Sequence, residues 1–144
     1  MTFFFSDVNE AVIQALNDRR EYTVTTAAEE KQQFIVTNVS GVNSQTNEAK
    51  LIEAIAEADV ITTAVGPTIL PLIAKTIAKG LSARSSDTFV NVIACENAIR
   101  ATSQLKKLIF EQLSAEEQTK VEKILASRML RLIALSQMFN QMMC

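Results

Sequence analysis

The chain has 144 residues, of which 48% are hydrophobic and 21% are charged, and its formal net charge is −2. A chain of this length forms one globular domain that buries roughly two-thirds of its surface. The near-neutral charge provides no basic field for nucleic acid. No apolar run approaches the roughly 20 residues that span a bilayer. We therefore expect a cytoplasmic protein without a nucleic-acid or membrane partner.

Several classes of active site are excluded by residue types that are missing. The chain contains no histidine, which removes Ser-His-Asp and Cys-His catalysis and most zinc sites. Cys95 and Cys144 are far apart in sequence, and we predict neither a disulfide nor a metal site. The three glycines form neither a GxGxxG nor a GxxxxGK[ST] motif.

Hydrophobic patterns along the chain alternate between strand and helix. Short β-branched and aromatic runs predict buried strands, and apolar residues at helical spacing predict amphipathic helices. This alternation favours an α/β fold with a mostly parallel sheet and right-handed crossovers. The expected strands cover residues 2–6, 22–26, 34–39 (ending at Ser40-Gly41-Val42), 59–65 and 89–94. The expected helices cover residues 9–17, 47–57, 67–79 and 97–113, followed by one that begins at Ser114.

Local sequence features mark the ends of these helices. Asn9 is expected to cap the first helix, and Ser114 with Glu117 forms a capping box. Pro67 suits a first helical turn, and Gly80 suits a helix C-terminus. Residues 82–87 are expected to form a polar loop.

Asp7 is the first candidate site residue, at the end of the first expected strand. An acid at the end of the second strand of a Rossmann unit accepts hydrogen bonds from the adenosine ribose and disfavours a 2′-phosphate. Aspartate after a strand is also common as a turn or cap residue. The residues alone leave both interpretations open.

Two further candidate groups follow the strands at 59–65 and 89–94. Ligands of doubly wound sheets bind beyond the carboxyl ends of strands, so Val65 and Gly66 are candidate cofactor contacts, although a tight turn explains them equally well. Glu96 could orient a ribose or substrate hydroxyl, and Asn97 could cap the next helix. Cys95 is expected to be a buried, inert thiol. Three cations could meet an anion or belong to a solvated helix face: Arg100, Lys106 and Lys107.

Four segments together resemble a known family. They are Phe5-Ser6-Asp7-Val8-Asn9, Asp59-Val60-Ile61-Thr62-Thr63-Ala64-Val65-Gly66-Pro67, Ile77-Ala78-Lys79-Gly80-Leu81 and Asn91-Val92-Ile93-Ala94-Cys95-Glu96-Asn97. In this order and spacing they resemble the mannitol-1-phosphate branch of the polyol-specific long-chain dehydrogenases, over about residues 2–123. The resemblance implies a Rossmann domain, NAD as cofactor, and interconversion of mannitol 1-phosphate and fructose 6-phosphate. It also implies that Asp7 binds ribose.

The resemblance further implies what the chain lacks. The family begins with a strand and a glycine-rich loop that holds the pyrophosphate, and this chain starts after them. The family's catalytic lysine lies in a helical domain that has no match here, so no catalytic residue is carried over. We expect an incomplete Rossmann domain over residues 1–123, inactive by itself. Its unpaired sheet edges are expected to reduce stability or to mediate self-association.

Residues 124–144 depart from the family. With suitable codons, one base inserted after the codon of Lys123 restores a family-like sequence, so we expect an out-of-frame tail created by a one-base deletion. The chain would then be a non-functional remnant, from a decayed gene or a sequencing error, or a partial enzyme completed by a separately encoded piece. The alternative is a non-catalytic interaction module that uses the methionine-rich tail as a helix.

Overall fold

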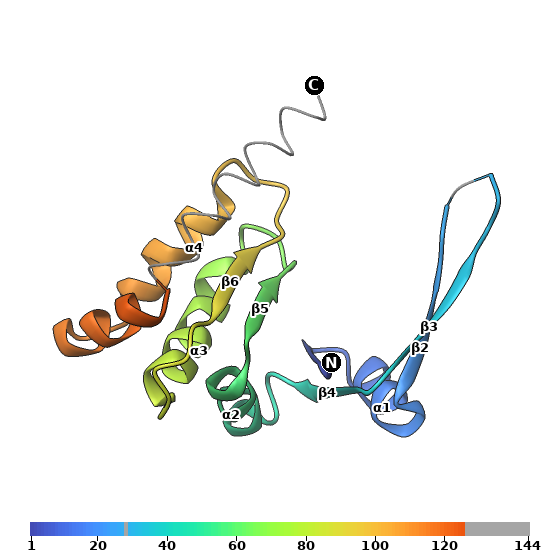
Figure 1. The fold of residues 1–144 in the computed structure, drawn as a ribbon, viewed down its shortest axis with the longest axis horizontal. Helices are drawn as coiled ribbons and strands as arrows, with labels where there is room; N and C mark the ends of the chain where they lie inside the picture. Colours follow the sequence, from blue (N-terminus) through green and yellow to red (C-terminus); the bar gives the residue numbers. More distant parts are fainter. Residues whose placement is uncertain (28, 126–144) are drawn as a thin grey trace. The chain divides into compact units, whose positions relative to one another are not determined.

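The computed structural model describes residues 1–27 and 29–125, and the chain divides after Leu51 into two compact units (Figure 1). The elements of the first unit are β1 (Phe3–Asp7), α1 (Glu10–Arg19), β2 (Glu21–Thr25), β3 (Gln33–Thr37) and β4 (Val39–Asn43). Helix α2 (Glu48–Glu57) crosses the division. The second unit continues with β5 (Val60–Thr63), α3 (Leu70–Ala83), β6 (Asn91–Ala94) and α4 (Ala101–Phe110), and residues 115–125 are also helical.

The first unit contains one parallel and one antiparallel strand pair. β1 pairs in parallel with β4, from Phe3 opposite Val39 to Asp7 opposite Asn43, and β2 pairs antiparallel with β3. The single strand expected over residues 34–39 is wrong, because the chain breaks at Asn38 into β3 and β4. Asn38 has φ +58, a left-handed conformation that asparagine tolerates better than most residues.

Helix α1 is fixed on β4 by one apolar contact and one pair of hydrogen bonds. Ile13 is buried against Gly41, where an added Cβ would lie 2.9 Å from Ile13 Cδ1. The Asn17 side chain donates to Gly41 O at 3.0 Å and accepts from Gly41 N at 2.8 Å. The expected cap is confirmed, since Asn9 Oδ1 accepts from Val12 N at 3.3 Å.

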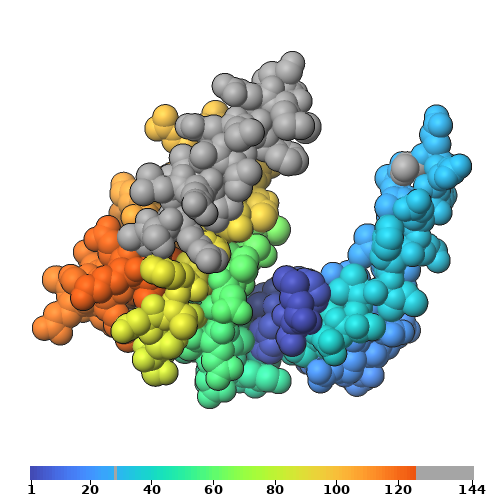
Figure 2. Space-filling view, viewed as in Figure 1, coloured from blue at the N-terminus to red at the C-terminus, as the bar shows by residue number. Residues whose placement is uncertain are grey.

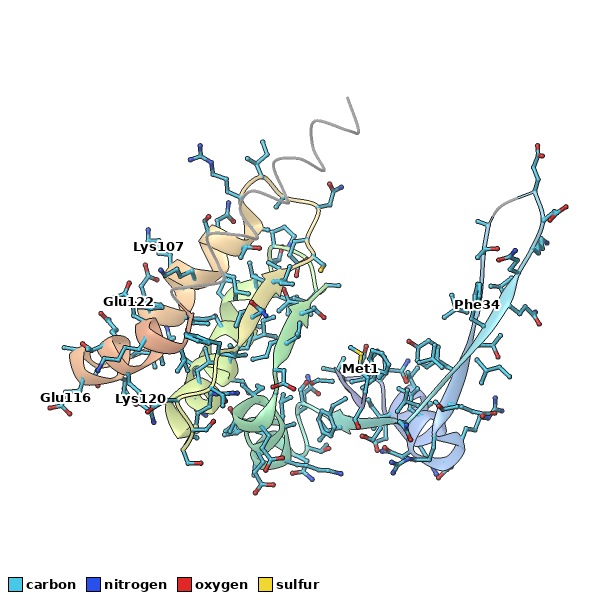
Figure 3. All side chains as sticks on the ribbon, viewed as in Figure 1. Met1, Phe34, Lys107, Glu116, Lys120 and Glu122 are labelled. Atoms are coloured by element: carbon cyan, nitrogen blue, oxygen red, sulfur yellow. The ribbon has the colours of Figure 1, made fainter. Side chains whose placement is uncertain are left out.

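The β2–β3 hairpin extends from its unit with much of its apolar surface uncovered. It stands clear of α1 and β1 in the space-filling view (Figure 2), and Phe34 projects from it in Figure 3. Phe34 is 52% exposed and Ile35 is 66% exposed, on opposite faces of β3. At the base, Tyr22 packs edge-to-face on Phe5 with ring centroids 5.7 Å apart.

The second unit is a parallel strand pair covered by helices. β5 pairs with β6 from Val60 opposite Asn91 to Thr63 opposite Ala94, and α3 and α4 pack together beside them (Figure 1). Each unit therefore contains a parallel strand pair, in agreement with the predicted α/β class, whereas β2 and β3 form an antiparallel hairpin. The apolar side chains buried here are Ile55, Leu70, Ala74, Ile77, Ala78, Leu81, Val90, Val92, Ala101, Leu105, Ile109, Leu113, Val121, Ile124 and Leu125.

Helix α3 is shifted from its expected position at both ends. Pro67 lies in the turn before the helix, and Pro71 occupies the first helical turn, where its missing N–H costs little. The expected end at Gly80 is wrong, because α3 continues to Ala83. Gly80 is instead an interior helical residue, and a Cβ added there would lie 2.5 Å from Ile55 Cβ and 3.2 Å from Ile52 O.

Arg84 is buried, in a segment that the sequence predicts as a polar loop. It follows the last residue of α3 and is only 2% exposed. Its Nη1 donates to Ala58 O at 2.7 Å and to Ile55 O at 3.3 Å, and its Nη2 donates to Thr88 Oγ1 at 3.0 Å. Arg84 thus joins the end of α2 to the segment that leads into β6.

The C-terminal region confirms one prediction and corrects another. The capping box forms, with Ser114 N donating to Glu117 Oε2 at 2.8 Å and Glu117 N donating to Ser114 Oγ at 3.4 Å. The helix expected from Asn97 starts only at Ala101. Residues 126–144 lie outside the described residues, so the out-of-frame tail and the methionine-rich interaction helix stay predictions.

Sheet edges remain open in both units. Within the part of the chain that the structure describes, β1 pairs only with β4, and β5 pairs only with β6. Each of these strands therefore carries backbone groups along one side that no other described strand covers. The expected self-association through such edges stays a prediction.

Candidate functional site

Asp7 lies at the carboxyl end of β1, as the sequence predicts. Its side chain is exposed, and its Oδ1 accepts a hydrogen bond from Asn9 N at 2.9 Å. A bond to the amide two residues later is typical of an aspartate in a turn, which is one of the two roles that the sequence predicts for Asp7. Because the residue remains exposed while its orientation is fixed, the same carboxylate is also accessible to a ligand.

Asn43, opposite Asp7 in the strand register, is a residue that sequence reasoning missed. It is 7% exposed, and its Nδ2 donates to Val8 O at 3.3 Å and to Glu10 Oε2 at 2.6 Å. Its Oδ1 accepts from Gln45 N at 2.9 Å. Asn43 therefore fixes the loop that follows Asp7. Its place at the end of a strand was the only indication available from the sequence.

The second unit presents a turn where β5 ends. Gly66 has φ +85, a conformation that strains any residue with a Cβ. An added Cβ would meet nothing within 4 Å, so the space over Gly66 is open and the backbone alone demands glycine. Gly66 O accepts from Ile69 N and from Leu70 N, both at 3.2 Å, and this leads the chain into α3.

Glu96 follows β6, and its carboxylate is bound to this turn. Oε1 accepts from Thr63 Oγ1 and from Val65 N, both at 3.0 Å, and Oε2 accepts from Gly66 N at 2.7 Å. Burial opposes the charged form, but the hydrogen bonds from Val65, Gly66 and Thr63 outweigh it and hold the pKa of Glu96 below its ordinary value. The carboxylate is thus engaged within its own unit, and the predicted ribose contact stays a prediction.

The residues on either side of Glu96 differ from their expected roles. Cys95 is exposed, so the expectation of a buried thiol is wrong; its backbone N–H donates to Thr63 O at 2.8 Å and extends the ladder of β5 and β6. Asn97 does not cap a helix, because Arg100, with φ 56, lies at the N-cap position of α4. The side chain of Asn97 is exposed.

The lysines of α4 are surface residues with partners in their own unit. Lys106 Nζ lies 3.8 Å from Glu122 Oε1 and 5.2 Å from the centre of the Phe110 ring. Lys107 Nζ lies 3.8 Å from Glu111 Oε1, one helical turn away, and points outward in Figure 3. The geometry supports a solvated helix face, the second of the two interpretations drawn from the sequence.

Two kinds of feature are absent from residues 1–27 and 29–125. No group of three or more His, Cys, Asp and Glu side chains is arranged to hold a metal ion there. No helix in those residues has the length and apolarity needed to cross a membrane.

Comparison with known proteins gives consistent matches. A family model described as the mannitol dehydrogenase Rossmann domain matches residues 1–128. The mannitol-1-phosphate 5-dehydrogenase of Shouchella clausii is 64% identical over 115 residues, covering 80% of this chain and 31% of the relative. The protein of the same name from Bacillus pumilus is 52% identical over 114 residues, covering 79% and 31%. The chain thus spans 31% of the length of these two relatives.

Proposed function

The chain belongs to the family of mannitol dehydrogenase Rossmann domains, and from this premise we propose that it is the cofactor-binding part of an NAD-dependent mannitol-1-phosphate 5-dehydrogenase. Such an enzyme converts mannitol 1-phosphate and NAD to fructose 6-phosphate and NADH. The observation that carries the proposal is the exposed Asp7 carboxylate at the carboxyl end of β1. An acid at this position of a Rossmann domain accepts hydrogen bonds from the adenosine ribose.

Asp7 is suited to bind the ribose of NAD and to reject NADP. Its bond to the Asn9 amide fixes one carboxylate oxygen, so the ribose hydroxyls meet an acceptor that is already oriented. The negative charge repels the 2′-phosphate that distinguishes NADP from NAD. The Asn43 side chain donates to Val8 O and so stabilises the loop that follows Asp7.

In the second unit, Val65, Gly66 and Asn97 are the proposed cofactor contacts. The open space over Gly66 allows a flat ligand to approach the backbone closely. Val65 and Asn97 are exposed, and they follow the carboxyl ends of β5 and β6. When bound, NAD supplies the acceptor for the hydride that leaves the substrate. The residues of this unit would bind and orient it.

We predict that replacing Asp7 with serine weakens NAD binding by about tenfold, or about 1.4 kcal/mol. The reason is that serine keeps a hydrogen-bonding group but loses the charged acceptor. The same change should narrow the preference for NAD over NADP. Titration of the isotope-labelled chain with each dinucleotide, followed by amide chemical shifts in NMR spectra, measures both affinities and detects even millimolar binding.

The matched control is Asp18→Asn, which removes one exposed carboxylate of the same unit from α1. We expect it to leave the affinity for NAD unchanged. Equal losses for Asp7→Ser and Asp18→Asn would mean that only the overall charge matters, and the assignment of Asp7 to the ribose would be withdrawn.

We further propose that the chain does not turn over substrate by itself. Residues 60–69 and 94–100, around the ends of β5 and β6, include no lysine or histidine to serve as a base, and the Glu96 carboxylate is occupied by three donors. Mixing the purified chain with mannitol 1-phosphate and NAD should produce no NADH absorbance above a blank. Steady NADH formation that scales with the amount of chain would refute this prediction.

A further inference from the structure

The turn after β5 has the geometry of an anion-binding nest. The consecutive N–H groups of Val65 and Gly66 both point to one acceptor, and the Thr63 hydroxyl adds a third donor beside them. Successive amides around a residue in a left-handed conformation form a concavity that attracts negative charge, as in many phosphate sites. In this chain the occupant of the nest is the carboxylate of Glu96.

The occupant comes from the neighbouring strand rather than from solvent. Glu96 lies 30 residues from Gly66 in sequence, but β5 and β6 end side by side (Figure 1), so its side chain reaches the turn directly. Both carboxylate oxygens are used, at 2.7 to 3.0 Å from their donors. These distances are those of well-formed hydrogen bonds to a charged acceptor.

We propose that Glu96 is a positioning residue whose carboxylate acts as an internal anion, holding the turn from Thr63 to Gly66 in place and keeping phosphate groups out of its nest. This inference rests on the proposed function only in that the turn faces the cofactor. A cofactor would then approach Gly66 through van der Waals contact. Its phosphates would bind elsewhere, because the nest amides are already paired and a carboxylate repels a phosphate.

The ionisation of Glu96 provides a direct readout. Burial raises the pKa of Glu96, but the hydrogen bonds that its carboxylate accepts from Val65, Gly66 and Thr63 together lower the pKa by more. The charged form is therefore favoured in the folded chain. The contribution of Glu96 to stability is therefore present above the ordinary glutamate pKa and is lost as the pH falls through the lowered value. Residues 60–69, which include the turn, contain no titratable side chain. Around Glu96, residues 94–100 add only the titratable groups of Cys95 and Arg100.

The first measurement is a pH titration of the full 144-residue chain by NMR. The amide protons of Val65 and Gly66 should shift together, with a shared midpoint below the ordinary glutamate value of about 4.3. Glu96→Gln should abolish this transition, because an amide group does not ionise and its NH₂ cannot accept from Gly66. Val65 and Gly66 amides that do not respond to pH in the unchanged chain would overturn the proposal.

The second measurement tests whether the vacated nest binds an external carboxylate. Acetate added to Glu96→Ala should shift the Val65 and Gly66 amides in a saturable way, at least tenfold more tightly than in the unchanged chain. The matched control is Glu53→Ala, which removes an exposed carboxylate from α2. Equal acetate effects in all three chains would show general salt binding and would contradict the proposal.

Both measurements can be separated from the test of the proposed function. Neither uses NAD, so the result for Glu96 does not depend on whether Asp7 binds a ribose. If Glu96→Ala does not fold, the pH titration of the unchanged chain still decides the question. A shared transition supports the internal anion, and independent or absent transitions refute it.

Discussion

Replacing Arg84 with methionine is expected to lower the free energy of unfolding by about 2–4 kcal/mol, because it removes hydrogen bonds from a charged donor and leaves buried carbonyl groups unpaired. Arg84 is 2% exposed and donates to Ile55 O, Ala58 O and the Thr88 hydroxyl. The carbonyls of Ile55 and Ala58 lie at the C-terminus of α2, where a positive charge is favoured. Urea denaturation followed by circular dichroism measures the change.

Two controls show whether the bonds or the charge matter in this substitution. Arg84→Lys keeps the charge but has fewer donors in a different geometry, so we expect an intermediate loss. Arg19→Met changes an exposed arginine at the end of α1 and should alter the free energy of unfolding by less than about 0.5 kcal/mol. Similar losses for Arg84→Met and Arg19→Met would refute the structural role of Arg84.

Replacing Gly80 with alanine is expected to destabilise the chain by about 1–3 kcal/mol, although alanine is the better helix former. The added Cβ would lie 2.5 Å from Ile55 Cβ and 3.2 Å from Ile52 O, so α3 and α2 would have to separate. The gain in helix propensity is about 1 kcal/mol and does not offset this overpacking. Thermal and urea denaturation of the two chains provide the comparison.

A double-mutant cycle with Ile55→Ala tests whether the contact itself is the cause. Ile55→Ala alone leaves a cavity and should cost about 2–5 kcal/mol. In the double variant the new Cβ fills part of that cavity, so the combined loss should be clearly smaller than the sum of the single losses. Additive losses would show that residues 80 and 55 do not interact. That outcome would contradict the contact between α3 and α2 at Gly80.

Elements with local signals could be predicted from the sequence. The Asn9 cap and the capping box of Ser114 and Glu117 form as expected, because each depends on groups within three residues of one another. The strand that ends at Asp7 and the β-branched run before Gly66 were also placed correctly to within a residue or two. The alternation of strands and helices was enough to indicate the α/β class, and the Rossmann domain followed from the family resemblance.

Features that depend on distant residues could not be predicted in this way. Arg84 looked like a loop residue because its partners at Ile55 and Ala58 lie 29 and 26 positions earlier in the chain. Gly80 looked like a helix end because its packing on Ile55 leaves no local trace. Glu96 is a candidate site residue in the sequence because it follows a strand, but its three bonds to the turn after β5 depend on β5 and β6 lying side by side.

The amide pair between Asn17 and Gly41 has a consequence for how α1 is oriented. Apolar contacts such as that of Ile13 are non-directional and would tolerate a helix that rolls about its axis. The Asn17 side chain donates to and accepts from one backbone unit, as a neighbouring strand would, and a roll of one residue would break both bonds. The two hydrogen bonds therefore select a single rotational orientation of α1 about its axis. Burial alone would leave several such orientations nearly equal in energy.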